Sequence, residues 1–168
     1  YAELAIAGGK LMNEKELLAI PLYQERYFAY IASSHPLFSH ASIASNEIAD
    51  DTMWLLKGGH CLRGESDNNM EQSLVAGYEE GSVDTLIRIV DANGGYTVIP
   101  ELHIGLLKRC QKRSVRPLHH PEQVRQISLV VRNDFVKERL LNTVVDQLKK
   151  IIPATMINQR LKKFKVKL

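Results

Sequence analysis

Apolar runs of strand length alternate with segments of helical period, and this alternation restricts the fold more than any other feature of the sequence. The clearest case starts at Ser82, a residue type that caps helix N-termini, and continues with apolar residues at helical spacing. Asn93-Gly94-Gly95 predicts the end of that helix, and the β-branched residues 96–99 predict a strand. Further strand-like runs cover residues 4–7, 17–23, 27–32, 52–56, 73–78 and 124–131. Strands alternating with helices predict an α/β domain with a largely parallel sheet.

Three other segments carry weaker helix signals. Ser45 can cap a short helix over residues 46–49, and Pro100 stands where another helix can begin. From about position 134 to 152 the period is helical, and Pro153 ends that helix. In the helix after Pro100 we expect Leu102, Leu106 and Leu107 to face inward. In the helix over residues 134–152 we expect an inward face of Leu140, Leu141, Val144, Val145 and Leu148.

Composition excludes several classes of protein. The chain has 168 residues, 45% of them hydrophobic, which suffices for one well-packed domain or two small lobes. Its net charge is +3, and residues of both charges are interspersed up to position 160. Residues 160–168 form a basic tail that we expect to be either disordered or an edge strand. The body therefore lacks a nucleic-acid-binding pattern. No signal peptide and no apolar run of membrane-spanning length is present. The presence of two cysteines favours a reducing cytoplasm. We expect no cofactor and no metal; the alternative is a metal bound by His119 and His120.

The stretch Lys57-Gly58-Gly59-His60-Cys61-Leu62-Arg63-Gly64 has the most chemical character. A thiol reacts as its thiolate, and nearby positive charge lowers its pKa. Arg63 is a permanent cation, and His60 can donate a hydrogen bond or accept a proton. The glycines indicate a tight turn, after which a helix start would aim backbone N–H groups at the sulfur. The alternative is a buried Cys61 that packs like a small hydrophobic residue.

Two blocks of sequence carry a resemblance to a known family. Gly59-His60-Cys61-Leu62-Arg63 resembles the peroxide-sensing cysteine loop of the OxyR group of LysR-type transcriptional regulators. The second block runs from Gly81-Ser82-Val83-Asp84-Thr85-Leu86 to Gly94-Gly95-Tyr96-Thr97-Val98-Ile99-Pro100 and is similar to LysR-type effector domains in general. The resemblance spans about residues 4–148.

This resemblance implies a periplasmic-binding-protein-like effector domain of two α/β lobes, with the first lobe largely missing. Residues 1–15 would form the end of the first lobe, and residues 16–130 the second lobe with the redox loop. Residues 131–152 would be a helix that returns to the first lobe, followed by the C-terminal tail, 153–168. Since the chain begins at Tyr1, we expect it to be a fragment that lacks the N-terminal winged helix.

The resemblance also implies a chemistry. Cys61 would be oxidised by hydrogen peroxide to a sulfenic acid, with His60 beside the peroxide and Arg125 near the thiolate. Arg63 is a second candidate cation from its spacing alone. A second thiol would then form a disulfide, and cellular thiols would later reduce it.

The position of the family's second cysteine departs from the pattern. Nine residues after Cys61, where the family has its resolving cysteine, this chain has Met70. Either the protein lacks a resolving cysteine, or part of the loop is missing from the chain. Cys110, in a basic setting, is the other thiol that could serve as partner.

The resemblance gives the expected partners and leaves three functions to compare. As a sensor the protein would be no enzyme: it would form a dimer or tetramer and bind DNA through the absent domain. The second function is a LysR-type effector domain that binds a small organic ligand, with Cys61 not redox-active. The third, a thiol peroxidase, is disfavoured because no CxxC motif occurs.

Overall fold

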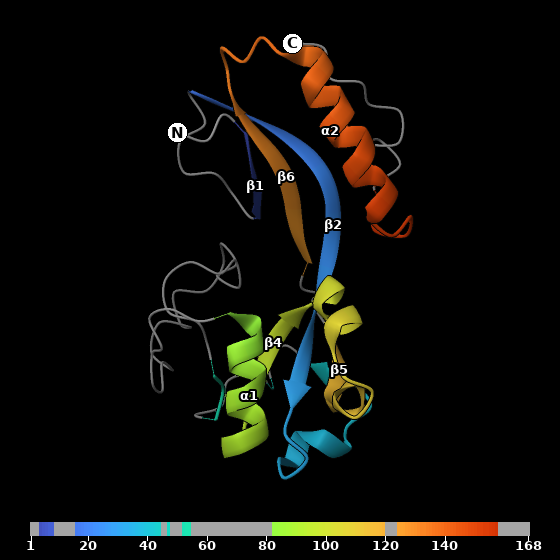
Figure 1. Ribbon diagram of the computed structural model, residues 1–168. Coiled ribbons are helices and arrows are strands. Elements are labelled where there is room, and N and C mark those ends of the chain that lie inside the picture. The colour runs from blue at the N-terminus through green and yellow to red at the C-terminus, as the bar shows by residue number, and fades with distance from the viewer. Residues whose placement is uncertain are drawn as a thin grey trace. The chain divides into compact units, whose positions relative to one another are not determined.

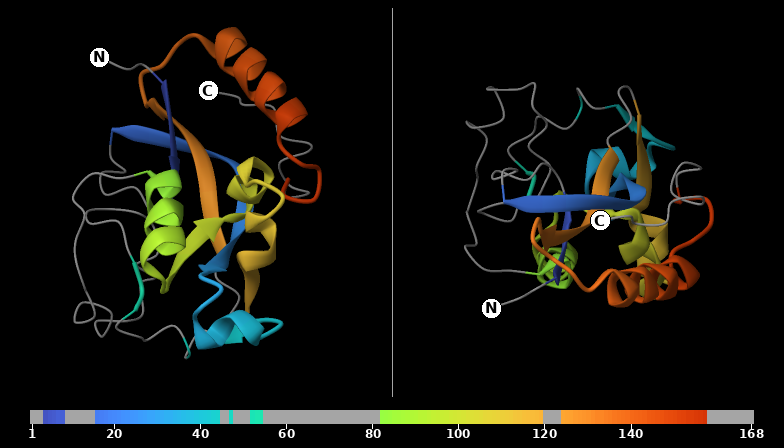
Figure 2. Two further views of the ribbon diagram at one scale, coloured as in Figure 1. Left: turned by 60° about the horizontal axis from the view of Figure 1, so that its bottom comes forward. Right: turned by 90° about the horizontal axis from the view of Figure 1, so that it is seen from above.

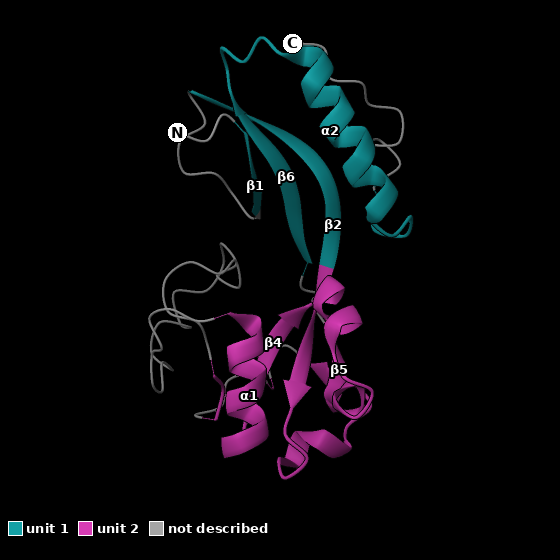
Figure 3. Ribbon diagram, viewed as in Figure 1, with its two compact units in different colours: residues 1–25, 124–168 teal, residues 26–123 magenta. Residues whose placement is uncertain are grey.

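The computed structural model divides into two compact units (Figures 1 and 3), formed by residues 1–25 with 124–168 and by residues 26–123. Strand β2, Leu17–Ile31, contributes its first part to unit 1 and its second part to unit 2. The boundaries between these units lie at 25/26 and 123/124, and the lobe boundaries expected at 15/16 and 130/131 stay a prediction. The residues that the structure describes are 4–8, 16–44, 47, 52–54, 82–119 and 124–157.

Unit 1 is a sheet with one helix against it (Figure 2). Strand β1, Leu4–Gly8, pairs antiparallel with β6, Val124–Arg132, and β6 in turn neighbours β2. Helix α2, Glu138–Ile151, packs its apolar residues on the strands, as the predicted spacing required. The buried core of this unit is Ile20, Leu22, Leu129, Val131, Leu141 and Val145.

Helix α2 confirms most of the predicted helical face. Leu141 and Val145 are buried and Leu148 packs beside them, whereas Leu140 is exposed, so its assignment to the inward face was wrong. Lys149 and Lys150 stand in the last turn, where positive charge interacts favourably with the helix dipole.

Unit 2 is built around the second part of β2. It pairs antiparallel with both β4, Tyr96–Pro100, and β5, Val115–His119. The short strand β3, Ile43–Ala44, pairs parallel with β5. Helix α1, Val83–Asn93, confirms the helix predicted after Ser82, and its apolar residues Leu86, Ile87 and Val90 are buried. Among the described residues, the 3-10 helices Pro36–Ser39, Glu101–Leu106 and Gln111–Ser114 connect these elements.

The strand pairing corrects two predictions. Among the described strands, most pairs are antiparallel, so the expected largely parallel sheet was wrong. The runs 17–23 and 27–32, predicted as two strands, form the single strand β2. The intervening residues Gln24, Glu25 and Arg26 contain no turn former, and the carboxylate of Glu25 is buried within the strand.

The segment after Pro100 also differs from expectation. It forms a 3-10 helix in which Leu106 is 75% exposed and Leu102 is exposed, and Leu107, just beyond it, is buried. The tighter 3-10 turn repeats every three residues, so a face calculated for an α-helix does not stay on one side.

Four predicted elements lie partly or wholly outside the described residues: the helix over 46–49, the end of the strand 52–56, the strand 73–78 and the tail 160–168. No helix among the described residues is long and apolar enough to span a membrane.

Candidate functional site

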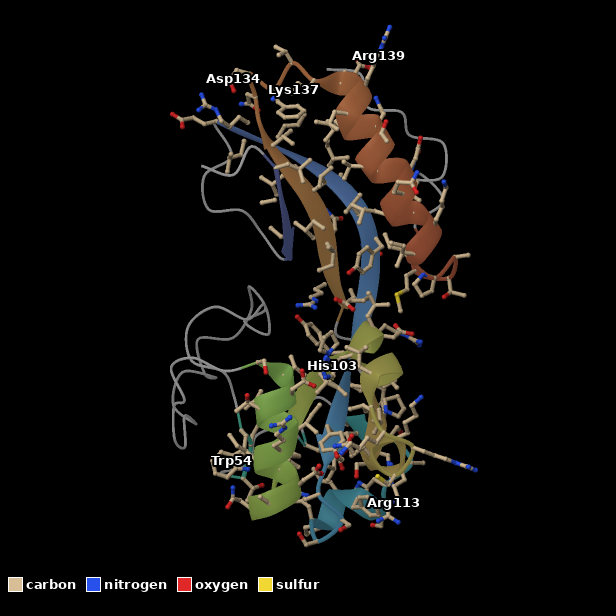
Figure 4. All side chains as sticks on the ribbon, in the orientation of Figure 1. Trp54, His103, Arg113, Asp134, Lys137 and Arg139 are labelled. Atoms are coloured by element: carbon tan, nitrogen blue, oxygen red, sulfur yellow. The ribbon has the colours of Figure 1, made fainter. Side chains whose placement is uncertain are left out.

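The segment that carries Cys61 starts from a firmly held tryptophan. Met53 makes a parallel bridge with Tyr96, and the Trp54 backbone N–H donates to the Tyr96 carbonyl at 2.8 Å. The Trp54 indole Nε1 donates to the Gly94 carbonyl at 2.9 Å, and the Thr97 hydroxyl donates to the Trp54 carbonyl at 2.8 Å. Trp54, labelled in Figure 4, is therefore fixed to the turn between α1 and β4.

The end of the same segment is fixed by the helix cap that the sequence predicted. Ser82 Oγ accepts a hydrogen bond from the Thr85 backbone N–H at 3.3 Å, and Asp84 in the first turn adds a favourable negative charge. Gly94 and Gly95, with φ of 82° and 78°, end α1 and turn the chain into β4. Both anchors of residues 55–81 thus belong to the α1–β4 part of unit 2.

Arg125 lies in β6 and binds a buried carboxylate of unit 1. Its Nε donates to Glu25 Oε1 at 2.6 Å, and its Nη2 lies 2.6 Å from the same oxygen. Glu25 is 1% exposed and the Arg125 side chain 18% exposed. Charge-assisted hydrogen bonds of this length, away from water, hold the guanidinium in one orientation. Arg125 is therefore a member of a buried ion pair.

Tyr23 lies in the field of this ion pair. Burial raises the pKa of the Tyr23 phenol, the charge of Glu25 raises it further, and Arg125 opposes the shift. Tyr23 therefore stays a neutral hydroxyl at physiological pH. Next along β2, the Gln24 backbone N–H donates to the Met156 carbonyl at 3.1 Å, which ties the turn after α2 to this strand.

Of the predicted site residues, the structure describes Arg125 and leaves His60, Cys61 and Arg63 outside the described residues, together with Met70. The proximity of Arg125 to Cys61 therefore stays a prediction. Cys110, the other candidate thiol, is exposed at the start of the 3-10 helix Gln111–Ser114. Within the described ranges, no group of three or more His, Cys, Asp or Glu side chains could hold a metal ion, and His119 belongs to no such group.

Sequence reasoning missed Glu25. A signal was present: a carboxylate stands between two apolar runs, at a position that becomes buried if both runs form one strand. A buried carboxylate requires a partner, and its partner is 100 positions away in the sequence. Nothing in the local pattern identifies Arg125 as that partner.

The sequence and the fold together define the class of protein. Residues 1–152 match the family model of the LysR substrate binding domain, so the chain belongs to that family. The mixed sheets with helices packed against them agree with this assignment.

Within that family the chain is similar to peroxide-responsive regulators. It is 29% identical to the hydrogen peroxide-inducible genes activator of Haemophilus influenzae over 80% of this chain and 47% of the relative. It is 30% identical to the DNA-binding transcriptional dual regulator OxyR of Escherichia coli, over 73% and 41%. The crystal structure of reduced OxyR from Porphyromonas gingivalis superimposes with a TM-score of 0.76 at 31% identity, covering 92% of this chain and 72% of that one. The chain thus spans less than half the length of these two curated relatives.

Proposed function

We propose that the chain is the regulatory part of a transcription regulator that senses hydrogen peroxide through Cys61. The observation that carries the proposal is its similarity to proteins named hydrogen peroxide-inducible genes activators, combined with the His60-Cys61-Leu62-Arg63 motif. The whole protein would act in the cytoplasm as a dimer or larger oligomer and bind DNA through a winged helix-turn-helix that precedes this chain. It would be a regulator and not an enzyme.

The proposed chemistry begins with the Cys61 thiolate. Its sulfur attacks one oxygen of hydrogen peroxide, the O–O bond breaks, and the departing hydroxide takes a proton to become water. His60 would donate to the departing oxygen, while Arg63 and Arg125 would stabilise the thiolate. A second thiol then attacks the sulfenic acid, which forms a disulfide and releases water, and a cellular thiol later reduces it. Cys110 is a candidate for that second thiol.

The fixed ends of residues 55–81 support a regulatory role. Disulfide formation requires two sulfurs at bonding distance, so a Cys61 farther than that from its partner thiol would have to move, and its segment with it. Because its ends are held at Trp54 and Ser82, a rearrangement would pull on the α1–β4 part of unit 2. We propose that this changes how two regulatory domains pack and thus the spacing of the DNA-binding domains.

Trapping of the sulfenic acid tests the proposal. The reduced chain, treated with a low excess of hydrogen peroxide and a dimedone-type reagent, is expected to carry the adduct on Cys61. Cys61→Ser should abolish the adduct and leave the fold intact, because the change removes little volume. Cys110→Ser is the matched control and should keep the adduct. An unreactive Cys61, together with retention of an organic acid by the reduced chain, would favour the ligand-binding alternative.

A further inference from the structure

Unit 2 contains a cavity of about 520 Å³ whose lining belongs entirely to that unit. The end of β2, the end of α1 and the 3-10 helix Gln111–Ser114 form its walls. A volume of this size falls in the range of small-molecule sites. The polar side chains around it are those of Tyr30, Ser33, Ser34, Asp91, Asn93, Cys110, Gln111, Arg113 and Ser114.

A fixed carboxylate stands in this cavity. The hydroxyl of the fully buried Tyr30 donates to Asp91 Oδ1 at 2.6 Å, and Gln111 Nε2 donates to Asp91 Oδ2 at 3.0 Å. Gln111 is itself oriented, since its Oε1 accepts the Lys108 backbone N–H at 3.0 Å. Each carboxylate oxygen can accept two hydrogen bonds, so exposed Asp91 keeps acceptor capacity for a ligand.

The same wall carries a concentration of positive charge. Arg113 lines the cavity, and Lys108, Arg109 and Lys112 stand within five positions of it in the sequence. All four side chains are exposed, and none makes an ion pair in the part of the chain that the structure describes. The Arg113 carbonyl accepts a hydrogen bond from Arg116 Nη1 at 2.6 Å, which fixes the turn. Arg113, in the 3-10 helix Gln111–Ser114, is labelled in Figure 4.

These two features favour one kind of ligand. Arg113, with three further cations near it in the sequence, attracts a dianion more strongly than a monoanion, and guanidinium geometry matches the oxygens of a phosphate. Asp91, the serines and Gln111 supply partners for hydroxyl groups. We propose that this cavity binds a small phosphorylated polyhydroxy compound, such as a sugar phosphate, with Arg113 on the phosphate and Asp91 on the hydroxyls. The cavity shares Cys110 with the proposed peroxide chemistry, where Cys110 is a candidate second thiol, but binding of the phosphorylated compound does not require Cys61.

Cys110 provides a reporter for this site because it lines the cavity and is exposed. In a Cys61→Ser chain it is the remaining thiol, since the sequence has two cysteines. Alkylation of Cys110 is measured with glucose 6-phosphate, with glucose and with inorganic phosphate. At glucose 6-phosphate concentrations about ten times the Kd, the alkylation rate should fall roughly tenfold. Glucose and inorganic phosphate at the same concentration should leave the rate nearly unchanged.

Two variants assign the residues. Arg113→Gln should abolish the protection, whereas Arg139→Gln, which removes an exposed cation from α2 in unit 1, should retain it. Asp91→Asn keeps an acceptor for Tyr30 and should weaken the protection by glucose 6-phosphate. Ligand-observed NMR on the unalkylated chain gives a second readout. The proposal is overturned if glucose 6-phosphate does not protect, if inorganic phosphate protects equally well, or if Arg113→Gln keeps full protection.

Discussion

Replacement of Gly95 by alanine is the sharpest perturbation of the anchor that precedes Cys61. Gly95 has a φ of 78°, and a Cβ there would collide with the Thr52 carbonyl oxygen and lie 2.9 Å from the Trp54 indole nitrogen. Gly94, with a φ of 82°, offers a matched control, because a Cβ there meets nothing closer than the Ser34 hydroxyl at 3.5 Å. Both changes strain the backbone, and the change at Gly95 alone displaces Trp54.

The magnitudes follow from these two contributions. Positive φ in a residue with a Cβ costs about 1–3 kcal/mol, which applies to both variants. Forcing Thr52 and Trp54 apart in Gly95→Ala adds roughly 1–3 kcal/mol, as in other overpacked sites. We therefore expect Gly94→Ala to lower the free energy of unfolding measurably, and Gly95→Ala to lower it further.

Tryptophan fluorescence distinguishes backbone strain from displacement of the Trp54 indole, since Trp54 is the sole tryptophan of the chain. Gly95→Ala should shift its emission to longer wavelength and increase acrylamide quenching, because the indole loses its hydrogen bond to Gly94 and gains contact with water. Gly94→Ala should retain the native emission despite its lower stability. Under the proposed function, Gly95→Ala should also change the labelling rate of Cys61. Identical spectra in the two variants and the parent chain would refute the assigned contact.

Four further outcomes are expected. Arg125→Ala should cost about 3 kcal/mol of stability by urea unfolding, because it leaves a buried carboxylate without its guanidinium, and should slow peroxide oxidation of Cys61 without abolishing it. Thiol labelling against pH should show that Cys61 has a pKa below about 8.5 and reacts faster than Cys110 at neutral pH; the reverse order would contradict the redox assignment. The hydrogen bond from Arg26 lowers the pKa of Glu101 from its usual 4.5. The free energy of unfolding should therefore contain a contribution that is present above pH 4.5 and is lost as the pH falls, and Glu101→Gln should remove this contribution. Sedimentation should show a dimer or larger species; a monomer at high concentration would oppose it.

Local signals explain what could be predicted from the sequence. Ser82 and the pair Gly94-Gly95 bracket a helix whose apolar spacing is regular, so α1 and the following strand were both predicted at nearly their observed bounds. The end of α2 was likewise marked by Pro153. In each case the residue that decides the structure stands next to the residues whose conformation it determines.

The errors share a different cause. Whether residues 17–31 form one strand or two depends on Glu25, which is stabilised inside the strand by a residue 100 positions away. The exposure of Leu106 depends on the choice of a 3-10 over an α-helix. Strand direction likewise depends on which distant segments meet. Spacing within a window of ten residues contains none of this information.

The Glu25–Arg125 ion pair also changes how the role of Arg125 should be understood. The resemblance assigns the guanidinium to the thiolate, where its positive charge would lower the pKa of Cys61. A carboxylate 2.6 Å from that guanidinium offsets most of its charge as felt at a distance. Under the proposed function Arg125 would then act mainly as an oriented hydrogen-bond donor, and Arg63 and His60 would provide most of the stabilisation of the Cys61 thiolate. Glu25→Gln distinguishes these roles, since restoring the net charge of Arg125 should lower the pKa of Cys61, whereas loss of orientation should raise it.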